Sequence, residues 1–202
     1  KILTIDPNSA PADMLAGEAL DQMDDHEGAV AQFEAAVKAN PREPNVHFGL
    51  AYLLLTQKRF QDAIPEFKAE LENDPSHTQA RVYLGDCYIH VEDREHARPE
   101  LERAVKEDPS IELAHLDLGI IYAAQGHNEA ALTQLKKAIE LDPKDADPHW
   151  RLARLYQAMG QTDKARAESV LVSKMKKEAY QTLYQQISGA HKTPPPGVPG
   201  PE

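Results

Sequence analysis

Histidines are the residues of this 202-residue chain that first suggest chemistry, because neutral imidazole is a common zinc ligand and the chain has nine of them. His47, His115 and His149 are separated by multiples of 34 residues. Equivalent positions on stacked helices lie on the order of 10 Å apart, whereas a zinc–nitrogen bond is about 2 Å long. His90 and His96 flank a turn, but no third ligand accompanies them. We therefore expect no metal and no cofactor.

Catalytic groups are equally poorly represented. The sequence contains no Gly-x-Ser-x-Gly turn, no His-Glu-x-x-His motif and no glycine-rich phosphate loop. None of the six serines has a histidine or carboxylate at a spacing that suggests a catalytic base. Acidic pairs such as Asp24-Asp25 and Glu92-Asp93 are typical of solvated turns, and nothing in the sequence marks a pocket for paired catalytic carboxylates. We therefore expect a protein that is not an enzyme.

The elements that carry these residues repeat with a period of 34. Prolines recur at Pro7, Pro41, Pro75, Pro109 and Pro143. Two further positions of the frame hold only small residues, which are Ala29, Ala63, Ala97, Ala131 and Ala165 in one and Gly17, Ala51, Gly85, Gly119 and Ala153 in the other. Apolar residues within each copy are spaced i, i+4, i+7, and short polar stretches separate two such segments. Each copy is therefore predicted to be a helix–turn–helix whose apolar face needs a neighbour to bury it.

These repeats resemble the tetratricopeptide repeat (TPR) family. The matching residues of the best copy are Leu118-Gly119, Tyr122, Ala131, Leu135, Ala138 and Pro143. The resemblance covers roughly residues 1–177 and implies an all-α, right-handed α-solenoid of stacked helix-turn-helix units. It also implies a protein or peptide partner. One departure is that the family's bulky aromatic residue near the start of the first helix is replaced by His47, Arg81, His115 and His149.

The repeat frame predicts the domain organisation. We expect the end of a preceding half-repeat at 1–9, and five TPR-like units at 10–43, 44–77, 78–111, 112–145 and 146–177. A long C-terminal capping helix is predicted at 164–188, where it overlaps the last unit, and 189–202 is a Pro/Gly-rich tail of extended or polyproline type. Pro65 and Pro99 share one position of the second helix, where we expect a tolerated kink. Because the sequence begins at the end of a second helix, we expect it to be part of a longer repeat array.

The first helices of TPR units line a concave groove, so the resemblance implies which residues bind the ligand. These predicted peptide-binding residues are Phe48, Tyr52, Leu55, Tyr83, Asp86, Leu116, Ile120, Trp150, Arg151 and Arg154. Two interpretations of the aromatic residues are open, since they are suited both to anchoring a partner and to filling space between adjacent first helices. The clamp that chaperone-tail-binding members use on a terminal carboxylate is not supported, because Met14, Glu18 and Gly49 occupy its positions. Only Arg151 and Arg154 are placed to grip a carboxylate.

Charge and hydropathy limit the partners. The 22 Lys and Arg residues against 33 Asp and Glu residues give a net charge of −11, which disfavours nucleic acid. The longest apolar run, Leu50 to Leu55, is too short to cross a bilayer. Cys87 has no second cysteine with which to form an internal disulfide, and the compartment stays open between the cytoplasm and a mature secreted or periplasmic chain.

Three roles are compatible with these features. The first is a protein-interaction scaffold, the second a structural subunit that assembles head to tail into filaments, and the third an accessory domain of a larger enzyme or secretion component. The second role would use apolar residues at both ends of the array, which are Ile2, Leu3, Ile5, Leu183, Tyr184 and Ile187. Charge is also divided, with 29 acidic and 14 basic residues in 1–147 but 4 acidic and 8 basic residues in 148–202. The Pro-rich tail would act as a latch on an aromatic groove of a neighbour.

Overall fold

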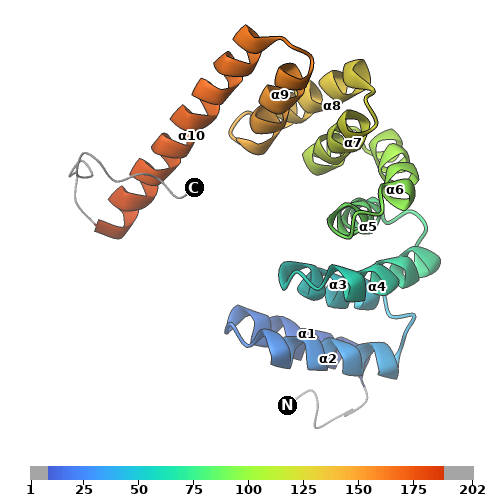
Figure 1. The fold of residues 1–202 in the computed structure, drawn as a ribbon. Helices are drawn as coiled ribbons and strands as arrows, with labels where there is room; N and C mark the ends of the chain where they lie inside the picture. The colour runs from blue at the N-terminus through green and yellow to red at the C-terminus, as the bar shows by residue number, and fades with distance from the viewer. Residues whose placement is uncertain (1–8, 189–202) are drawn as a thin grey trace. The chain divides into compact units, whose positions relative to one another are not determined.

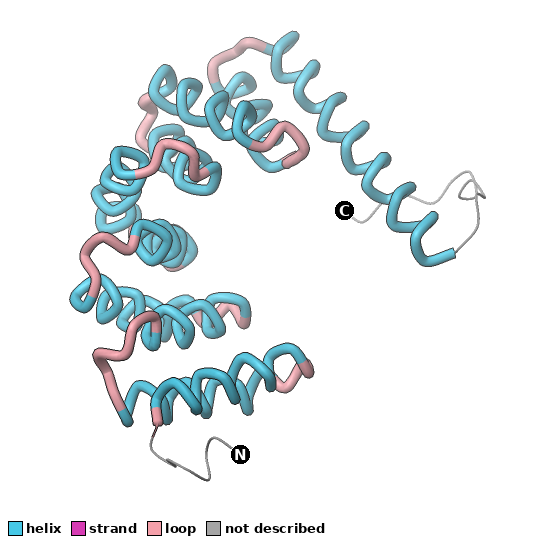
Figure 2. Tube along the Cα trace, turned by 180° about the vertical axis from the view of Figure 1, so that it is seen from behind, coloured by secondary structure: helices cyan, strands magenta, loops and turns pink. Residues whose placement is uncertain are grey.

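The computed structural model describes residues 9–188, which form helices and the turns between them (Figures 1 and 2). Within this range ten helices follow one another and no strand is present, which confirms the all-α class. The helices are α1 (Ala10–Gln22), α2 (His26–Ala39), α3 (Val46–Thr56), α4 (Phe60–Asn73), α5 (Thr78–His90), α6 (Arg94–Glu107), α7 (Glu112–Ala124), α8 (Asn128–Leu141), α9 (Asp147–Ala158) and α10 (Thr162–Ser188). The predicted half-repeat with Ile2, Leu3 and Ile5, and the predicted Pro/Gly-rich tail, lie outside the described residues.

The helices pair into hairpins that belong to two compact units, residues 1–109 and residues 110–202. Unit 1 contains the hairpins α1–α2, α3–α4 and α5–α6, and unit 2 contains α7–α8 and α9–α10. Within each unit the second helix of one hairpin packs against the first helix of the next, and consecutive first helices also contact each other. Each hairpin thereby buries the apolar face that it cannot bury alone.

Small residues allow the two helices of a hairpin to pack closely. A Cβ atom at Gly17, Gly85 or Gly119 would lie 2.5–2.6 Å from the side chain 16 residues later, which is Phe33, Leu101 or Leu135 respectively. That separation is shorter than a carbon–carbon contact. The alanines of the second helix, such as Ala29, Ala97 and Ala131, are fully buried. The period of 34 residues therefore repeats a close helix–helix contact.

Every hairpin turn has the same backbone geometry. One position of the turn has a positive φ in all five copies. The φ values are 61° at Asp24, 59° at Lys58, 62° at Glu92, and 73° at both Gly126 and Gly160. The next residue donates its N–H to a carbonyl five residues earlier, as Arg59 does to Leu54 at 2.8 Å. This is the Schellman arrangement that ends helices with a left-handed residue. Three of the five turns thus hold a side chain where glycine is preferred.

The two prolines inside second helices do not end those helices. Pro65 and Pro99 lie inside α4 and α6, which continue through them, and both prolines are on the solvent side.

The final helix, α10, runs for 27 residues and spans the predicted capping segment. Ala165 and Val172 in its first half are buried, whereas most of its second half is exposed.

Candidate functional site

Three histidines that share one position of the repeat are paired within their own hairpins. His47 and His149 donate from Nδ1 to the carboxylates of Glu66 and Glu168, at 2.6 and 2.7 Å. His115 makes the equivalent 2.7 Å bond to the amide oxygen of a glutamine. In all three cases the partner lies 19 residues later on the second helix, and the imidazole is buried. Residues 9–188 contain no group of three or more His, Cys, Asp or Glu side chains arranged to hold a metal ion.

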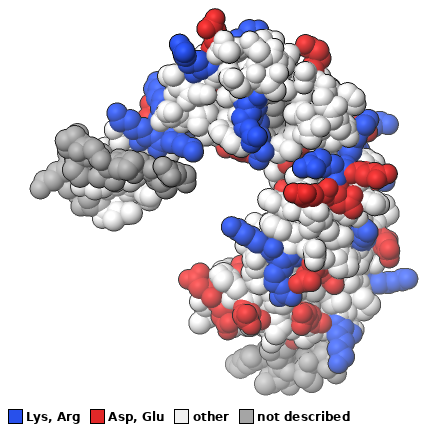
Figure 3. Space-filling view, viewed as in Figure 1, with Lys and Arg blue, Asp and Glu red and all other residues white. Residues whose placement is uncertain are grey.

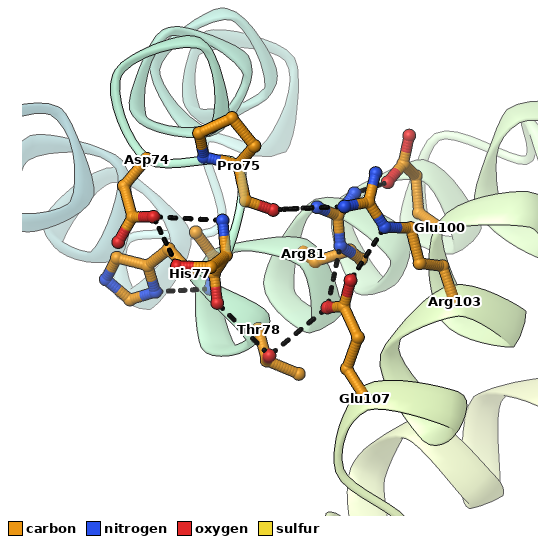
Figure 4. Close-up of polar contacts among 10 residues, drawn as sticks. Asp74, Pro75, His77, Thr78, Arg81, Glu100, Arg103 and Glu107 are labelled. Carbon is orange, nitrogen blue, oxygen red and sulfur yellow. Dashed lines mark hydrogen bonds and ion pairs between the residues drawn. The ribbon is translucent and has the colours of Figure 1, made fainter.

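Arg81 occupies the same position in the α5–α6 hairpin and makes a larger network (Figure 4). Its buried guanidinium donates to Glu100 at 2.7 Å, to the carbonyl of Pro75 at 2.6 Å and to Glu107 at 3.4 Å. Burial raises the pKa of Glu107, but a 2.7 Å hydrogen bond from Arg103 and the charge of Arg81 outweigh burial, so the pKa is lowered. This network joins α5, α6 and the preceding loop, so its role is structural.

The predicted aromatic residues of unit 1 form one cluster, here called the aromatic face, made of Phe48, Tyr52 and Tyr83. Their ring centroids are 6.2 Å apart for Phe48 and Tyr52, 6.1 Å for Phe48 and Tyr83, and 5.5 Å for Tyr52 and Tyr83. Behind it, the Phe48 ring contacts the fully buried Phe67 and stacks on His77 at 4.6 Å. Phe48 and Tyr83 are half-buried and fill space between α3 and α5, whereas Tyr52 is 42% exposed.

The other two predicted residues of unit 1, Leu55 and Asp86, are half-buried. Burial raises the pKa of the Asp86 carboxyl, although the nearby His90 acts in the opposite direction. Asp86 Oδ1 lies 3.4 Å from His90 Nε2, and the His90 ring stacks on Phe60 at 4.1 Å. His90 and Phe60 also line an open depression at the edge of unit 1 that is formed by residues 58–62 and 90–92.

Three side chains on α9 of unit 2 form a cluster, here called the Trp–Arg cluster, which is made of Trp150, Arg151 and Arg154. The guanidinium carbons of Arg151 and Arg154 lie 4.9 and 4.8 Å from the Trp150 ring centroid. Arg151 also donates to Asp147 at 3.3 Å. Trp150 is 39% exposed, and Arg154 is exposed as well.

The two remaining groove residues of unit 2 belong largely to its core. Leu116 is only 6% exposed and packs in a buried cluster with Leu135, Leu152 and Leu155. The expectation that Leu116 faces a ligand is therefore corrected, because its side chain lies between the helices. Ile120 is half-buried and packs against the same cluster.

The predicted self-association residues that the structure describes lie at the C-terminal end of α10. Leu183 and Ile187 are exposed, and Tyr184 is half-buried. None of the helices described here is long and apolar enough to cross a membrane.

Comparison with known proteins identifies the repeats. Tetratricopeptide repeat models match residues 14–78 and 54–117, and a TPR repeat model matches residues 119–160. No curated protein sequence matches the chain significantly.

Solved structures share the fold along most of the chain. YrrB, described as a TPR protein with an unusual peptide-binding site, is 19% identical with a TM-score of 0.73, covering 92% of this chain and 96% of that chain. MamA 41-end from Desulfovibrio magneticus RS-1 is 20% identical with a TM-score of 0.76, covering 84% and 96%. TTC0263, a thermophilic TPR protein in Thermus thermophilus, is 26% identical with a TM-score of 0.60, covering 89% and 96%. The α-solenoid fold is thus confirmed, and the chain belongs to the tetratricopeptide repeat family.

Proposed function

We propose that this protein-interaction scaffold binds a peptide or helix on the faces of its first helices, and that the aromatic face of unit 1 is its main contact. The observation that carries the proposal is the exposed ring of Tyr52, which is supported from behind by Phe48 and Tyr83. Peptide binding by a structurally similar TPR protein, YrrB, is in accord with this role. A non-enzymatic role is part of the proposal.

The physical reason lies in how the Tyr52 ring is held. Tyrosine provides a large apolar ring and a polar hydroxyl, and it is enriched among residues that dominate binding energy. The ring packs 6.2 Å from Phe48 and 5.5 Å from Tyr83, so it is already ordered before a ligand arrives. An ordered side chain loses less conformational entropy on binding than a free one. The exposed part of the ring is therefore suited to receive an apolar side chain of a partner.

The test begins with peptides selected from a displayed library of random linear sequences. Tyr52→Ala should weaken their binding by about tenfold or more, because an aromatic anchor that the ligand covers contributes at least ~1.4 kcal/mol to the binding free energy. Leu171→Ala is the matched control, since Leu171 is a similarly exposed apolar residue (37%) on α10 of unit 2. A Tyr52→Ala variant that unfolds more easily but keeps its affinity would show that the ring serves packing only.

Head-to-tail assembly is the second candidate. It is supported by the exposed Leu183 and Ile187 near the end of α10 and by the division of charge between 1–147 and 148–202. Complementary charges on opposite ends favour heterologous contacts, which propagate unless the rotation closes. Sedimentation at rising protein concentration and two salt levels tests this candidate. A monomer at high protein concentration and low salt would rule it out.

A further inference from the structure

Helix α9 carries two arginines packed on the single tryptophan of the chain. A guanidinium over an indole ring interacts with the π face and keeps its N–H donors available in its own plane. Arg151 uses one donor on Asp147 at 3.3 Å. Arg154 is exposed and has no carboxylate within 4.0 Å among residues 9–188.

The surroundings of this Trp–Arg cluster are basic. Residues 147–188, which include α9 and α10, contain seven basic side chains and four acidic ones. Three of the four acids are already paired, since Asp147 contacts Arg151, Glu168 contacts His149, and Glu178 lies 3.8 Å from Lys174. The basic side chains without a carboxylate within 4.0 Å in the described part are Arg154, Lys164, Arg166, Lys176 and Lys177. Figure 3 shows Lys and Arg side chains along the visible part of α10.

We infer that the Trp–Arg cluster binds an acidic peptide segment, whose Asp or Glu carboxylates accept hydrogen bonds from Arg154 and Arg151. The guanidinium presents a planar fork of donors that matches a carboxylate with two parallel bonds. Trp150 acts as a positioning residue, because its ring holds both guanidiniums at 4.8–4.9 Å and reduces the entropy that they lose on binding. The inference rests on the proposed function, which is binding of a peptide or helix by the first helices. It adds that the ligand bound by unit 2 is negatively charged.

A short acidic peptide fits this site better than a nucleic acid does. The basic area is local, whereas the chain as a whole has a net charge of −11. A nucleic acid strand carries phosphates along its whole length, and the net negative charge of the chain disfavours binding of such a polyanion. A peptide with a few carboxylates contacts only the basic area. The positive charge of the basic area therefore favours an acidic ligand. Its small extent favours a short peptide over a nucleic acid strand.

Fluorescence of Trp150 measures binding directly, since no other tryptophan contributes. The probes are the blocked peptide EEFEELEE, its basic counterpart KKFKKLKK, and a short oligothymidylate. The acidic peptide should give a saturable fluorescence change. Its affinity should fall as the salt concentration rises, because dissolved ions screen the attraction between peptide and protein charges. Arg154→Gln should weaken its binding about tenfold, and Arg154→Lys should restore part of the loss, because charge returns without the planar fork. Arg94→Gln is the matched control, as an exposed arginine on α6 of unit 1 with no ion pair among residues 9–188, and should leave affinity unchanged.

Four results would overturn the inference. The first is no response to the acidic peptide, and the second is equal affinity in wild type and in an Arg154→Gln variant that unfolds at the wild-type midpoint. The third is tighter, Arg154-dependent binding of the oligothymidylate. The fourth is a fluorescence change with protein concentration alone that Arg154→Gln abolishes, because the ligand would then be a second copy of the chain. If the basic peptide binds and the acidic one does not, the inference fails but peptide binding by unit 2 stands.

Discussion

His47 and Glu66 are 19 residues apart in the sequence, yet their side chains lie 2.6 Å apart and join α3 to α4. The same relationship joins His149 to Glu168 at 2.7 Å, between α9 and α10 in unit 2. Both imidazoles are buried, and both carboxylates are partly shielded from solvent. A position that the family fills with a bulky aromatic residue therefore holds a polar contact between the two helices of the hairpin.

Removing the carboxylate should destabilise the hairpin. Glu66→Ala leaves the buried imidazole of His47 without its partner, and an unsatisfied buried polar group costs about 1–3 kcal/mol. Urea unfolding of the variant measures the loss. Glu72→Ala, on the exposed side of the same helix, is the control and should change stability by less than ~0.5 kcal/mol. A double variant His47→Ala/Glu66→Ala that costs the sum of the single changes would contradict a direct interaction.

Glycine should stabilise the turns that hold a side chain at positive φ. Lys58 has φ of 59°, and Glu92 has φ of 62°. Replacing either with glycine relieves about 1–2 kcal/mol of left-handed strain, while the greater freedom of the unfolded chain returns about 0.4–1 kcal/mol. We expect a net gain of about 0.5–1 kcal/mol in the free energy of unfolding. Lys58→Ala is the matched control, because it removes the charge but keeps the Cβ atom. An equal gain from alanine would mean that charge, and not backbone strain, was relieved.

These turns and polar pairs also show what the sequence predicts and what it leaves out. The period of 34 residues, with glycine or alanine at one position, predicts helical hairpins because small residues permit close packing. The left-handed turn position is visible in the sequence only as Gly126 and Gly160, since the other three copies carry side chains there.

Contacts between helices were harder to predict than the helices themselves. Helical periodicity places His47 on its helix, but its partner 19 residues later depends on how the two helices cross. The position of Leu116 in the repeat predicts that it faces a ligand, whereas packing against α8 and α9 buries its side chain. The stacking of Phe48 on His77 depends likewise on a loop conformation. Sequence spacing therefore identified the faces of each helix but not the depth of each side chain.

The close contact at Gly119 gives a third prediction. A Cβ atom there would lie 2.6 Å from Cδ2 of Leu135, so Gly119→Ala should cost about 1–3 kcal/mol through overpacking. Leu135→Ala removes the obstructing side chain. In that background the same Gly119→Ala change should be neutral or stabilising, because alanine is favoured over glycine in a helix by about 1 kcal/mol. Thermal unfolding of the four proteins tests the reversal. A cost that is the same in both backgrounds would mean that Leu135 is not the obstacle.

Ionisation of Glu112 should make unit 2 less stable as pH rises. Burial and the charges of Asp145, Asp142 and Asp147 raise the pKa of Glu112 to about 7, from a usual value of 4.5. Its Oε1 atom is buried and has no hydrogen-bond partner among residues 9–188. Below pH 4.5 the folded and unfolded chains both hold the proton, so stability is not reduced. As pH rises towards 7 only the unfolded chain releases the proton freely, and above 7 the folded chain carries the full penalty.

Glu112→Gln tests this directly, because the amide keeps the shape of the side chain without the charge. Each pKa unit corresponds to about 1.4 kcal/mol, and since Glu112 is partly exposed, solvent screening reduces the expected effect to about 1–2 kcal/mol. The variant should unfold at higher urea concentration than wild type at pH 8, and the two should coincide near pH 4.5. Glu129→Gln is the matched control, since Glu129 also lies in the first turn of its helix but is exposed. A difference for Glu112→Gln that persists unchanged at low pH would assign the effect to the shape or hydrogen bonding of glutamine, because a charge effect must vanish once the carboxyl is protonated in both states.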